Sequence, residues 1–187
     1  GIAQELLDRG YTFDFVSDGL LEGVQFADGA LQTGGARYRA VVVPEARLMP
    51  HSTMAKLRRL AESGATVVFH RALPTDVPGF GQLAMRRHMF QEDGAALRRR
   101  ALIGESLERL LSAAVQRETL VDRGLHFVRR SYEQAHVYFL VNANTTPFAG
   151  WVSLATPAAG CLIFDPVSGR RGLGDSRSAS NGRLDVY

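Results

Sequence analysis

Cysteine, lysine and long apolar runs are all scarce in this sequence, and each shortage excludes a class of protein. The single cysteine, Cys161, excludes a disulfide framework and a cysteine-rich zinc site. No run approaches the roughly 18 consecutive apolar residues of a membrane-spanning helix. The first residues also lack the basic and apolar segments of a signal peptide. We therefore expect no membrane segment. The cellular compartment stays open, because extracellular enzymes need not contain disulfides.

Arginine carries almost all of the positive charge. Lys56 is the only lysine among 22 basic residues, and the formal net charge is +3. A basic chain can bind nucleic acid, but here the arginines are spread along the whole chain and no nucleic-acid-binding motif accompanies them. We predict no nucleic-acid partner. The arginine runs at residues 86–87 and 98–100 are expected on a solvated helix face or on a surface that docks another domain.

The rest of the composition is that of a folded protein. The 187 residues suffice for one large domain or two small ones with a buried core. Hydrophobic residues make up 45% and charged residues 22%, which argues against disorder.

The first part of the chain alternates strands with helices. Residues 38–43, ended by Pro44, and residues 65–70 are apolar runs typical of strands buried on both faces of a parallel sheet. Between them, residues 51–63 have the periodicity of a helix with Ser52 as its N-cap. This strand–helix–strand order predicts a doubly wound α/β layer. Further expectations are a helix over residues 1–9, a strand over 11–17, a hairpin over 24–32, and helices over 82–91 and 105–116.

The pattern changes near Asp122, where short alternating strands replace the helices. We predict strands over residues 126–132, 136–142, 150–155 and 161–165. Such strands favour an antiparallel β-sandwich. The predicted domains are an α/β domain over residues 1–121 and a sandwich over residues 122–187. Residues 184–187 begin what resembles a further strand, and the first element is a helix rather than a strand. Both ends therefore suggest a piece of a longer protein with a truncated sandwich.

Several stretches together resemble a known family. Residues 38–44, 48–50 and 64–69 resemble the glutamine-amidotransferase-like domain of multidomain glycoside hydrolases. Together with residues 73–79, these stretches look more specifically like that domain of the large bacterial alpha-L-rhamnosidases. Residues 125–130, 137–144 and 163–170 resemble the start of the β-sandwich that follows it in those enzymes.

The resemblance implies a fold and a function. The fold is a flavodoxin-like or class I glutamine-amidotransferase-like parallel layer, followed by a partial antiparallel β-sandwich. The parent enzyme would remove terminal alpha-L-rhamnose from glycans with carboxylate chemistry and a bound calcium, and it would be extracellular or periplasmic. Its catalytic carboxylates would lie in a barrel domain upstream of these residues.

In that case this chain is a non-catalytic accessory fragment without a cofactor of its own. Its partners are other domains of the same polypeptide and, through the parent enzyme, the glycan substrate. The alternative is a carbohydrate-binding or oligomerisation module without enzymatic activity, as in the trimerisation domains of beta-galactosidases.

Glycoside hydrolysis needs two carboxyl groups about 5 to 9.5 Å apart. Asp18 and Glu45 are the best pair, since each follows a predicted parallel strand and would lie at the same sheet edge. Alternatively, Asp18 caps a short helical turn and Glu45 lies in an exposed loop. We favour these structural roles and expect no catalytic residue in the chain.

The turn after the strand at residues 65–70 is a second candidate position for catalysis or ligand binding. A glutaminase would need a nucleophilic cysteine there. The turn instead holds His70 and Arg71, and Cys161 lies in the β region. Open α/β sheets bind ligands at such strand ends. Arg71 is thus a candidate to hold a glycan or an acidic residue of a neighbouring domain. Otherwise, both side chains bond to the loop at residues 73–81.

Metal and nucleotide signals are weak. The histidines show no i, i+4 pair. The turn at Asp165 hints at calcium, but a turn-forming aspartate is the favoured interpretation. The glycines at residues 34–35 and 172–174 do not form a phosphate loop, so no FMN is expected. Trp151 is a candidate sugar-stacking platform, although a lone tryptophan in a sandwich is more often part of the core.

Overall fold

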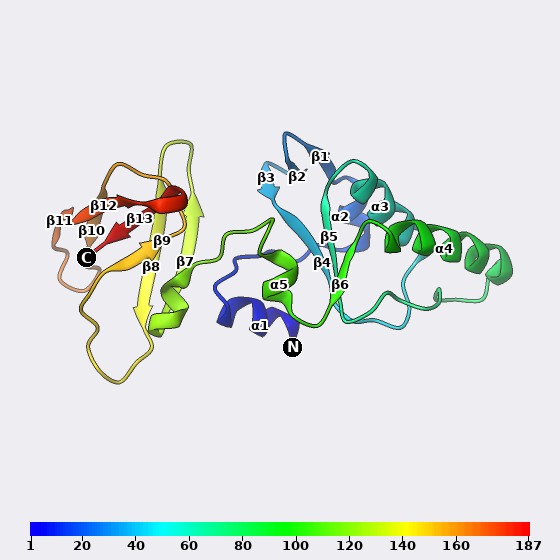
Figure 1. The fold of residues 1–187 in the computed structure, drawn as a ribbon, viewed down its shortest axis with the longest axis horizontal. Helices are drawn as coiled ribbons and strands as arrows, with labels where there is room; N and C mark the ends of the chain where they lie inside the picture. The colour runs from blue at the N-terminus through cyan, green and yellow to red at the C-terminus, as the bar shows by residue number, and fades with distance from the viewer. The chain divides into compact units, whose positions relative to one another are not determined.

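The computed structural model describes residues 1–187 and divides into two compact units (Figure 1). The α/β unit is Asp14–Val115, and the β unit combines Gly1–Phe13 with Gln116–Tyr187. This differs from the expected division between residues 121 and 122. The β unit begins earlier, at Gln116, and it includes the first helix, because the backbone N–H of Glu118 donates to the carbonyl of Gly10 at 2.9 Å.

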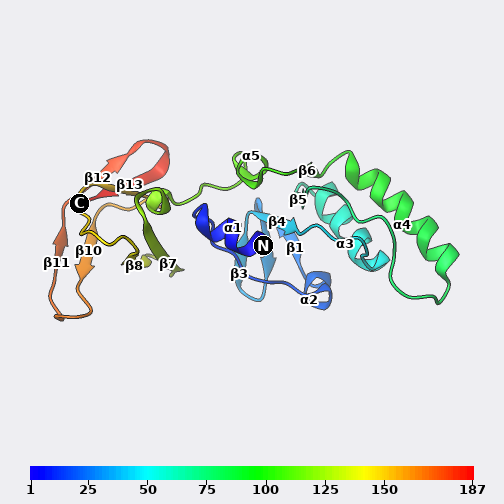
Figure 2. The same ribbon diagram turned by 90° about the horizontal axis from the view of Figure 1, so that it is seen from below.

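The α/β unit contains two three-stranded sheets. One is antiparallel, with the order β1-β2-β3, and the other is parallel, with the order β4-β5-β6. Helices α3 and α4 lie side by side next to the parallel sheet (Figures 1 and 2). The elements are α2 (Asp18–Glu22), β1 (Gln25–Ala27), β2 (Ala30–Thr33), β3 (Ala36–Tyr38), β4 (Ala40–Val43), α3 (His51–Glu62), β5 (Thr66–His70), α4 (Leu83–Arg98), β6 (Leu102–Gly104) and α5 (Leu107–Leu111).

The predicted strand–helix–strand unit is confirmed as β4, α3 and β5. Of the two apolar runs predicted to be buried on both faces, residues 65–70 form the central strand of the sheet, and Phe69 is fully buried. The prediction was wrong for residues 38–43, because β4 lies at the edge of the sheet and is half-buried at three of its four residues. Leu57 and Leu60 on α3 pack into the same core. The helix begins at His51, as predicted, but the N-cap position is held by Pro50 rather than by Ser52. Its last turn is followed by Gly64 with φ +102°, a conformation that favours glycine.

Three local expectations were wrong. The strand expected over residues 11–17 does not form, because no neighbouring strand pairs with the segment, and Ser17 instead caps α2. The helix expected over residues 105–116 covers only Leu107–Leu111, while the one expected over 82–91 extends to Arg98. Strand β6 was not expected, since its three residues are too short to show a periodicity.

The loop before α4 is attached to that helix by two arginines. Arg87 donates from Nε to Asp76 Oδ1 at 2.8 Å, and Arg86 donates to backbone carbonyls of the loop at Pro78, Gly79 and Gly81. Asp76 also accepts from the backbone N–H of Val77 at 2.8 Å. These two arginines therefore hold the loop, and Arg87 does so while its side chain stays 49% exposed.

The β unit is built from antiparallel pairs, as predicted. Its sheets have the orders β7-β8, β10-β11 and β12-β13-β9. A small core joins Leu120, Leu125 and Leu154 with half-buried neighbours such as Phe127. The elements are α1 (Ile2–Asp8), η1 (Thr119–Arg123), β7 (Leu125–Ser131), β8 (His136–Asn142), β9 (Val152–Leu154), β10 (Cys161–Phe164), β11 (Arg171–Gly174), β12 (Ser176–Ala179), η2 (Ser180–Gly182) and β13 (Arg183–Val186). No helix in either unit has the length and apolar character needed to cross a bilayer.

Replacing the core phenylalanine of β5 tests the packing of the parallel sheet. We expect Phe69→Ala to lower the free energy of unfolding by about 3–5 kcal/mol, because it leaves a cavity in the buried cluster. Phe80→Ala is the matched control. Its ring is 91% exposed, so a change of only about 0.5 kcal/mol or less is expected in urea unfolding. Equal effects of the two changes would contradict the assigned core.

The link between Asp76 and α4 predicts a pH dependence. Hydrogen bonds from Arg87 and from the backbone of Val77 lower the pKa of Asp76 from 3.8 to about 2. Because the folded-state pKa is lowered, the pair stabilises the fold above pH 3.8, and this contribution is lost as the pH falls toward 2. In an NMR titration of the carboxyl carbon, Arg87→Gln should raise the midpoint toward 3.8. Arg98→Gln, at the far end of the same helix, should leave it unchanged.

Candidate functional site

The carboxyl ends of β4 and β5 bring together two of the predicted site residues. The parallel register pairs Val43 with Phe69, and two residues further along each strand Glu45 meets Arg71. Their Oε2 and Nη1 atoms are 2.9 Å apart. Arg71 has φ +70°, and its backbone N–H donates to the carbonyl of Gly104 at 2.7 Å, so β6 helps to hold this turn.

This edge is open to solvent. The side chains of Arg71 and Glu45 are 57% and 55% exposed, and an ion pair of this kind contributes only about 0–1 kcal/mol. The contact of Arg71 with Glu45 is the ion pair that joins the two strand ends, whereas hydrogen bonds from His70 and Arg71 to the loop at residues 73–81 stay a prediction. His70, the last residue of β5, is half-buried beside the pair.

Asp18 belongs to a different part of the α/β unit. It is the first residue of α2, and its Oδ1 accepts a hydrogen bond of 2.8 Å from Thr53 Oγ1 on α3. Asp18 therefore joins two helices, and the N-cap is Ser17, whose side chain accepts from the backbone N–H of Leu20. The two carboxylates proposed as a pair thus have separate partners, since Glu45 is held by Arg71.

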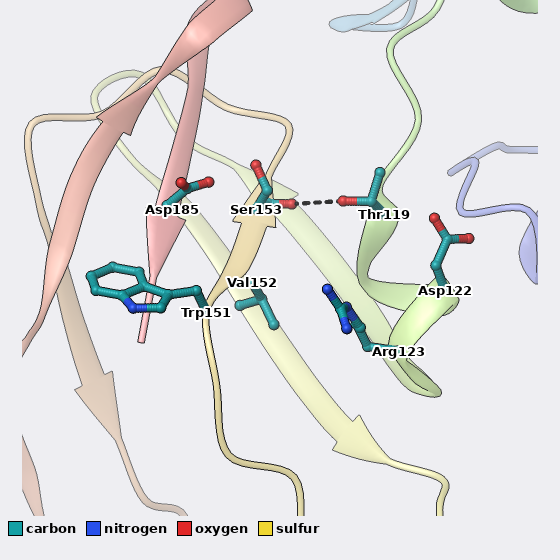
Figure 3. Close-up of a pocket in the computed structure, with 7 residues that line it drawn as sticks. All are labelled: Thr119, Asp122, Arg123, Trp151, Val152, Ser153 and Asp185. Atoms are coloured by element: carbon teal, nitrogen blue, oxygen red, sulfur yellow. Dashed lines mark hydrogen bonds between the residues drawn. The ribbon is translucent and has the colours of Figure 1, made fainter.

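Trp151, the last candidate, lines a pocket of about 410 Å³ in the β unit (Figure 3). The indole is 40% exposed, so it is not a core residue. Tyr187 lies against it with the ring centres 5.6 Å apart, and the guanidinium of Arg177 lies 4.4 Å from the ring centre. The lining comes from η1, β13 and the region around β9, and it consists of Thr119, Asp122, Arg123, Trp151, Val152, Ser153 and Asp185.

Both carboxylates of this pocket are neutralised by arginines. Arg117 binds Asp122 through two hydrogen bonds of 3.0 and 2.8 Å. Arg177 donates to Asp185 Oδ2 at 3.2 Å. A hydrogen bond from Ser153, together with that from Arg177, lowers the pKa of Asp185. Each carboxylate therefore has a guanidinium of its own as its partner.

The pocket wall is held by a hydrogen-bonded group around Ser153. Thr119 Oγ1 donates to the carbonyl of Ser153 at 3.3 Å, as the dashed line in Figure 3 shows. Arg183 donates to the same carbonyl at 2.8 Å and to Ser153 Oγ at 3.0 Å. Arg183 also reaches Thr119 Oγ1 at 3.1 Å, so η1, β9 and β13 are joined at one point.

A buried glutamate, Glu118, lies next to this wall, and the sequence did not single it out. Its side chain is 1% exposed. Oε1 accepts from Tyr138 at 2.7 Å and from Arg129 at 3.0 Å, and Oε2 accepts from the backbone N–H of Ala155 at 2.8 Å. Burial, followed by the charge of Glu118, raises the pKa of Tyr138. The sequence signal that could have revealed Glu118 is Arg129. This arginine lies at an inward-facing position of β7, and a guanidinium there requires a buried acidic partner.

One family model matches most of this chain. It is the model of the alpha-L-rhamnosidases, and it covers residues 2–156. The chain belongs to the alpha-L-rhamnosidase family. The resemblance seen in the sequence is thereby confirmed.

A solved rhamnosidase has a similar fold. The rhamnosidase from Novosphingobium sp. PP1Y superimposes with a TM-score of 0.68 at 22% sequence identity. The match covers 94% of this chain and 18% of that one, so the chain spans less than a fifth of the length of that rhamnosidase. No curated protein sequence matches this chain significantly.

Asp165 was the candidate calcium ligand in the sequence of this alpha-L-rhamnosidase family member. The turn expected to hint at calcium is closed by Asp165 itself, which accepts from the backbone N–H groups of Val167 and Ser168 and from the Ser168 hydroxyl. The described chain contains no cluster of three histidine, cysteine, aspartate or glutamate side chains able to hold a metal ion. The oxygens of Asp165 therefore serve the turn.

Replacing the buried glutamate tests the interior of the β unit. Glu118→Gln turns one acceptor into a donor, which then faces the donors Arg129 and Tyr138 or the backbone N–H of Ala155. We expect a loss of about 3–5 kcal/mol in the free energy of unfolding, measured in urea. Glu133→Gln, in the exposed turn between β7 and β8, is the control and should have little effect. A stability of Glu118→Gln equal to that of the control would contradict this role.

Proposed function

We propose that this chain is a non-catalytic accessory fragment of a larger alpha-L-rhamnosidase, which removes terminal alpha-L-rhamnose from glycans with a catalytic domain outside these residues. Two observations support the proposal. The family is that of the alpha-L-rhamnosidases, and the chain spans only 18% of the length of the similar solved rhamnosidase. The observation that carries the proposal is that the carboxylates of the candidate sites are bound by partners within the chain.

A glycosidase of the usual kind needs a carboxylic acid that stays protonated, so that it can donate a proton to the leaving group. The two carboxylates that line the pocket have the opposite arrangement. Asp122 is bound by Arg117 through two hydrogen bonds, and the pKa of Asp185 is lowered. Asp18 and Glu45 have separate partners. This favours structural over catalytic roles for these four acids.

The α/β unit is proposed to be a flavodoxin-like or class I glutamine-amidotransferase-like module that has no glutaminase chemistry. Strands β4, β5 and β6 are parallel and adjacent in chain order, with α3 and α4 as the connections, which is the pattern of such layers. The turn after β5 holds Arg71 in the left-handed conformation where a glutaminase would need its cysteine. Cys161 lies instead on β10 of the β unit.

The β unit is proposed to be part of a β-sandwich completed by other domains of the same polypeptide. The outward face of the β7–β8 hairpin supports this. Its side chains of Val128, Val137, Phe139 and Val141 are between 47% and 55% exposed. An apolar face of this kind is typical of a strand pair that packs against another layer. These neighbouring domains, and through them the glycan, are the partners we propose.

The accessory role predicts that the 187-residue chain has no turnover. Incubation with an aryl alpha-L-rhamnoside should release the aryl alcohol no faster than a buffer blank. As a matched control, Asp122→Asn with Asp185→Asn should give the same rate as the unchanged chain, since neither acid acts in catalysis. Release above the blank that is abolished by the double substitution would refute the accessory role.

A carbohydrate-binding module is the second candidate function. The observation that favours it is the exposed Trp151 in the pocket of the β unit, because an aromatic ring open to solvent can pack against the apolar face of a sugar. Sugar binding at this pocket and the accessory role are compatible.

A further inference from the structure

The pocket around Trp151 has one unpaired positive charge. Four charged groups at the pocket form pairs, since Arg117 binds Asp122 and Arg177 binds Asp185. The remaining charged residue of the lining, Arg123, is exposed, and its guanidinium makes no hydrogen bond or ion pair within the chain. Arg117 and Arg177, which lie beside the lining, pair with its two carboxylates, so the guanidinium of Arg123 is the charge of the pocket that is left without a partner.

The aromatic part of the pocket is held in place before any ligand arrives. Tyr187 and the guanidinium of Arg177 pack against the Trp151 indole, and Arg177 is itself bonded to Asp185. These contacts leave 40% of Trp151 exposed. A platform fixed in this way binds at a lower entropic cost than a mobile side chain.

The two features lie on either side of Val152. Figure 3 shows the Trp151 indole and the Arg123 side chain flanking that residue, with Ser153 and Asp185 along the adjoining wall. The volume of about 410 Å³ lies within the range of about 300–1,000 Å³ that is typical of small-molecule sites. One molecule can therefore contact both an apolar ring surface and a cation.

We propose that this pocket binds a saccharide that carries an anionic group, with a pyranose ring on Trp151 and the anion at Arg123. The choice of a saccharide rests on the proposed function, whereas the anionic group follows from the unpaired guanidinium of Arg123. A neutral sugar would leave Arg123 without a partner. A guanidinium matches the two oxygens of a carboxylate or sulfate, and hydrogen bonds between charged groups are about twice as strong as neutral ones.

Trp151 is the only tryptophan in the chain, so its fluorescence reports on this pocket alone. The unchanged 187-residue chain is titrated with disaccharides that contain glucuronic or galacturonic acid, with their carboxyl-reduced counterparts, and with a sulfated disaccharide. We expect the acidic sugars to shift the emission of Trp151 to shorter wavelength and to protect it from acrylamide. Their affinity should exceed that of the reduced forms about tenfold. A response to the sulfated sugar alone supports the site with sulfate as the anion.

Two variants assign the contacts. Arg123→Gln should lower the affinity for the acidic sugar to that for its reduced form, whereas Arg130→Gln, an exposed arginine of β7 outside the pocket, should leave it unchanged. Trp151→Ala should abolish binding in calorimetry. The proposal is overturned by the absence of response to every sugar, by equal affinity for acidic and reduced forms, or by an unaffected Arg123→Gln. Such a failure leaves the accessory role standing, because turnover of an aryl rhamnoside tests that role separately.

Discussion

The β unit depends on one buried carboxylate. Glu118 accepts hydrogen bonds from side chains of β7 and β8 and from the backbone just after β9. Arg183 of β13 lies 4.0 Å from Oε2 of the same carboxylate. Removing such a charge from water is costly unless its hydrogen-bonding capacity is filled, and here four groups surround it. Because the donors come from strands that belong to different sheets, one carboxylate joins segments that also meet in the small apolar core around Leu120 and Leu154. The same contacts bring η1 beside β9, where the pocket forms.

Apolar patterning predicted the parts of the fold that depend on local sequence. Strand β5 is a continuous apolar run because both of its faces are covered, and α3 shows the helical period of its buried face. The apolar run of β4 is only half-buried at three of its four residues, because β4 lies at the edge of the sheet. The meeting of Glu45 and Arg71 was half predicted. Both residues were predicted at the carboxyl ends of strands in one sheet. That Arg71 pairs with Glu45 depends on the register between β4 and β5, which no local sequence pattern shows. The segment at residues 11–17 alternates like a strand and yet has no strand to pair with.

Glu118 was missed for a different reason. Its partners Tyr138 and Ala155 are 20 and 37 residues away in the sequence, and Gly10 lies on the other side of the α/β unit in chain order. A network assembled from such distant residues leaves no periodic signal. The exposure of Trp151 also escaped prediction, because a tryptophan in a β region is usually core, and only the packing of Arg177 and Tyr187 shows which part of the ring stays open.

The discontinuous make-up of the β unit has a consequence for synthesis on the ribosome. Its first residues, which include Gly10, are translated before the α/β unit, and their partner Glu118 emerges only afterwards. Gly10 has φ +80°, and a side chain there would overlap the carbonyl of Glu118, so the early segment is shaped for a partner that does not yet exist. The α/β unit, which is continuous, can fold while the chain is still growing, but the β unit must wait for residues at both ends. The chain order therefore allows the α/β unit to fold before the β unit is complete.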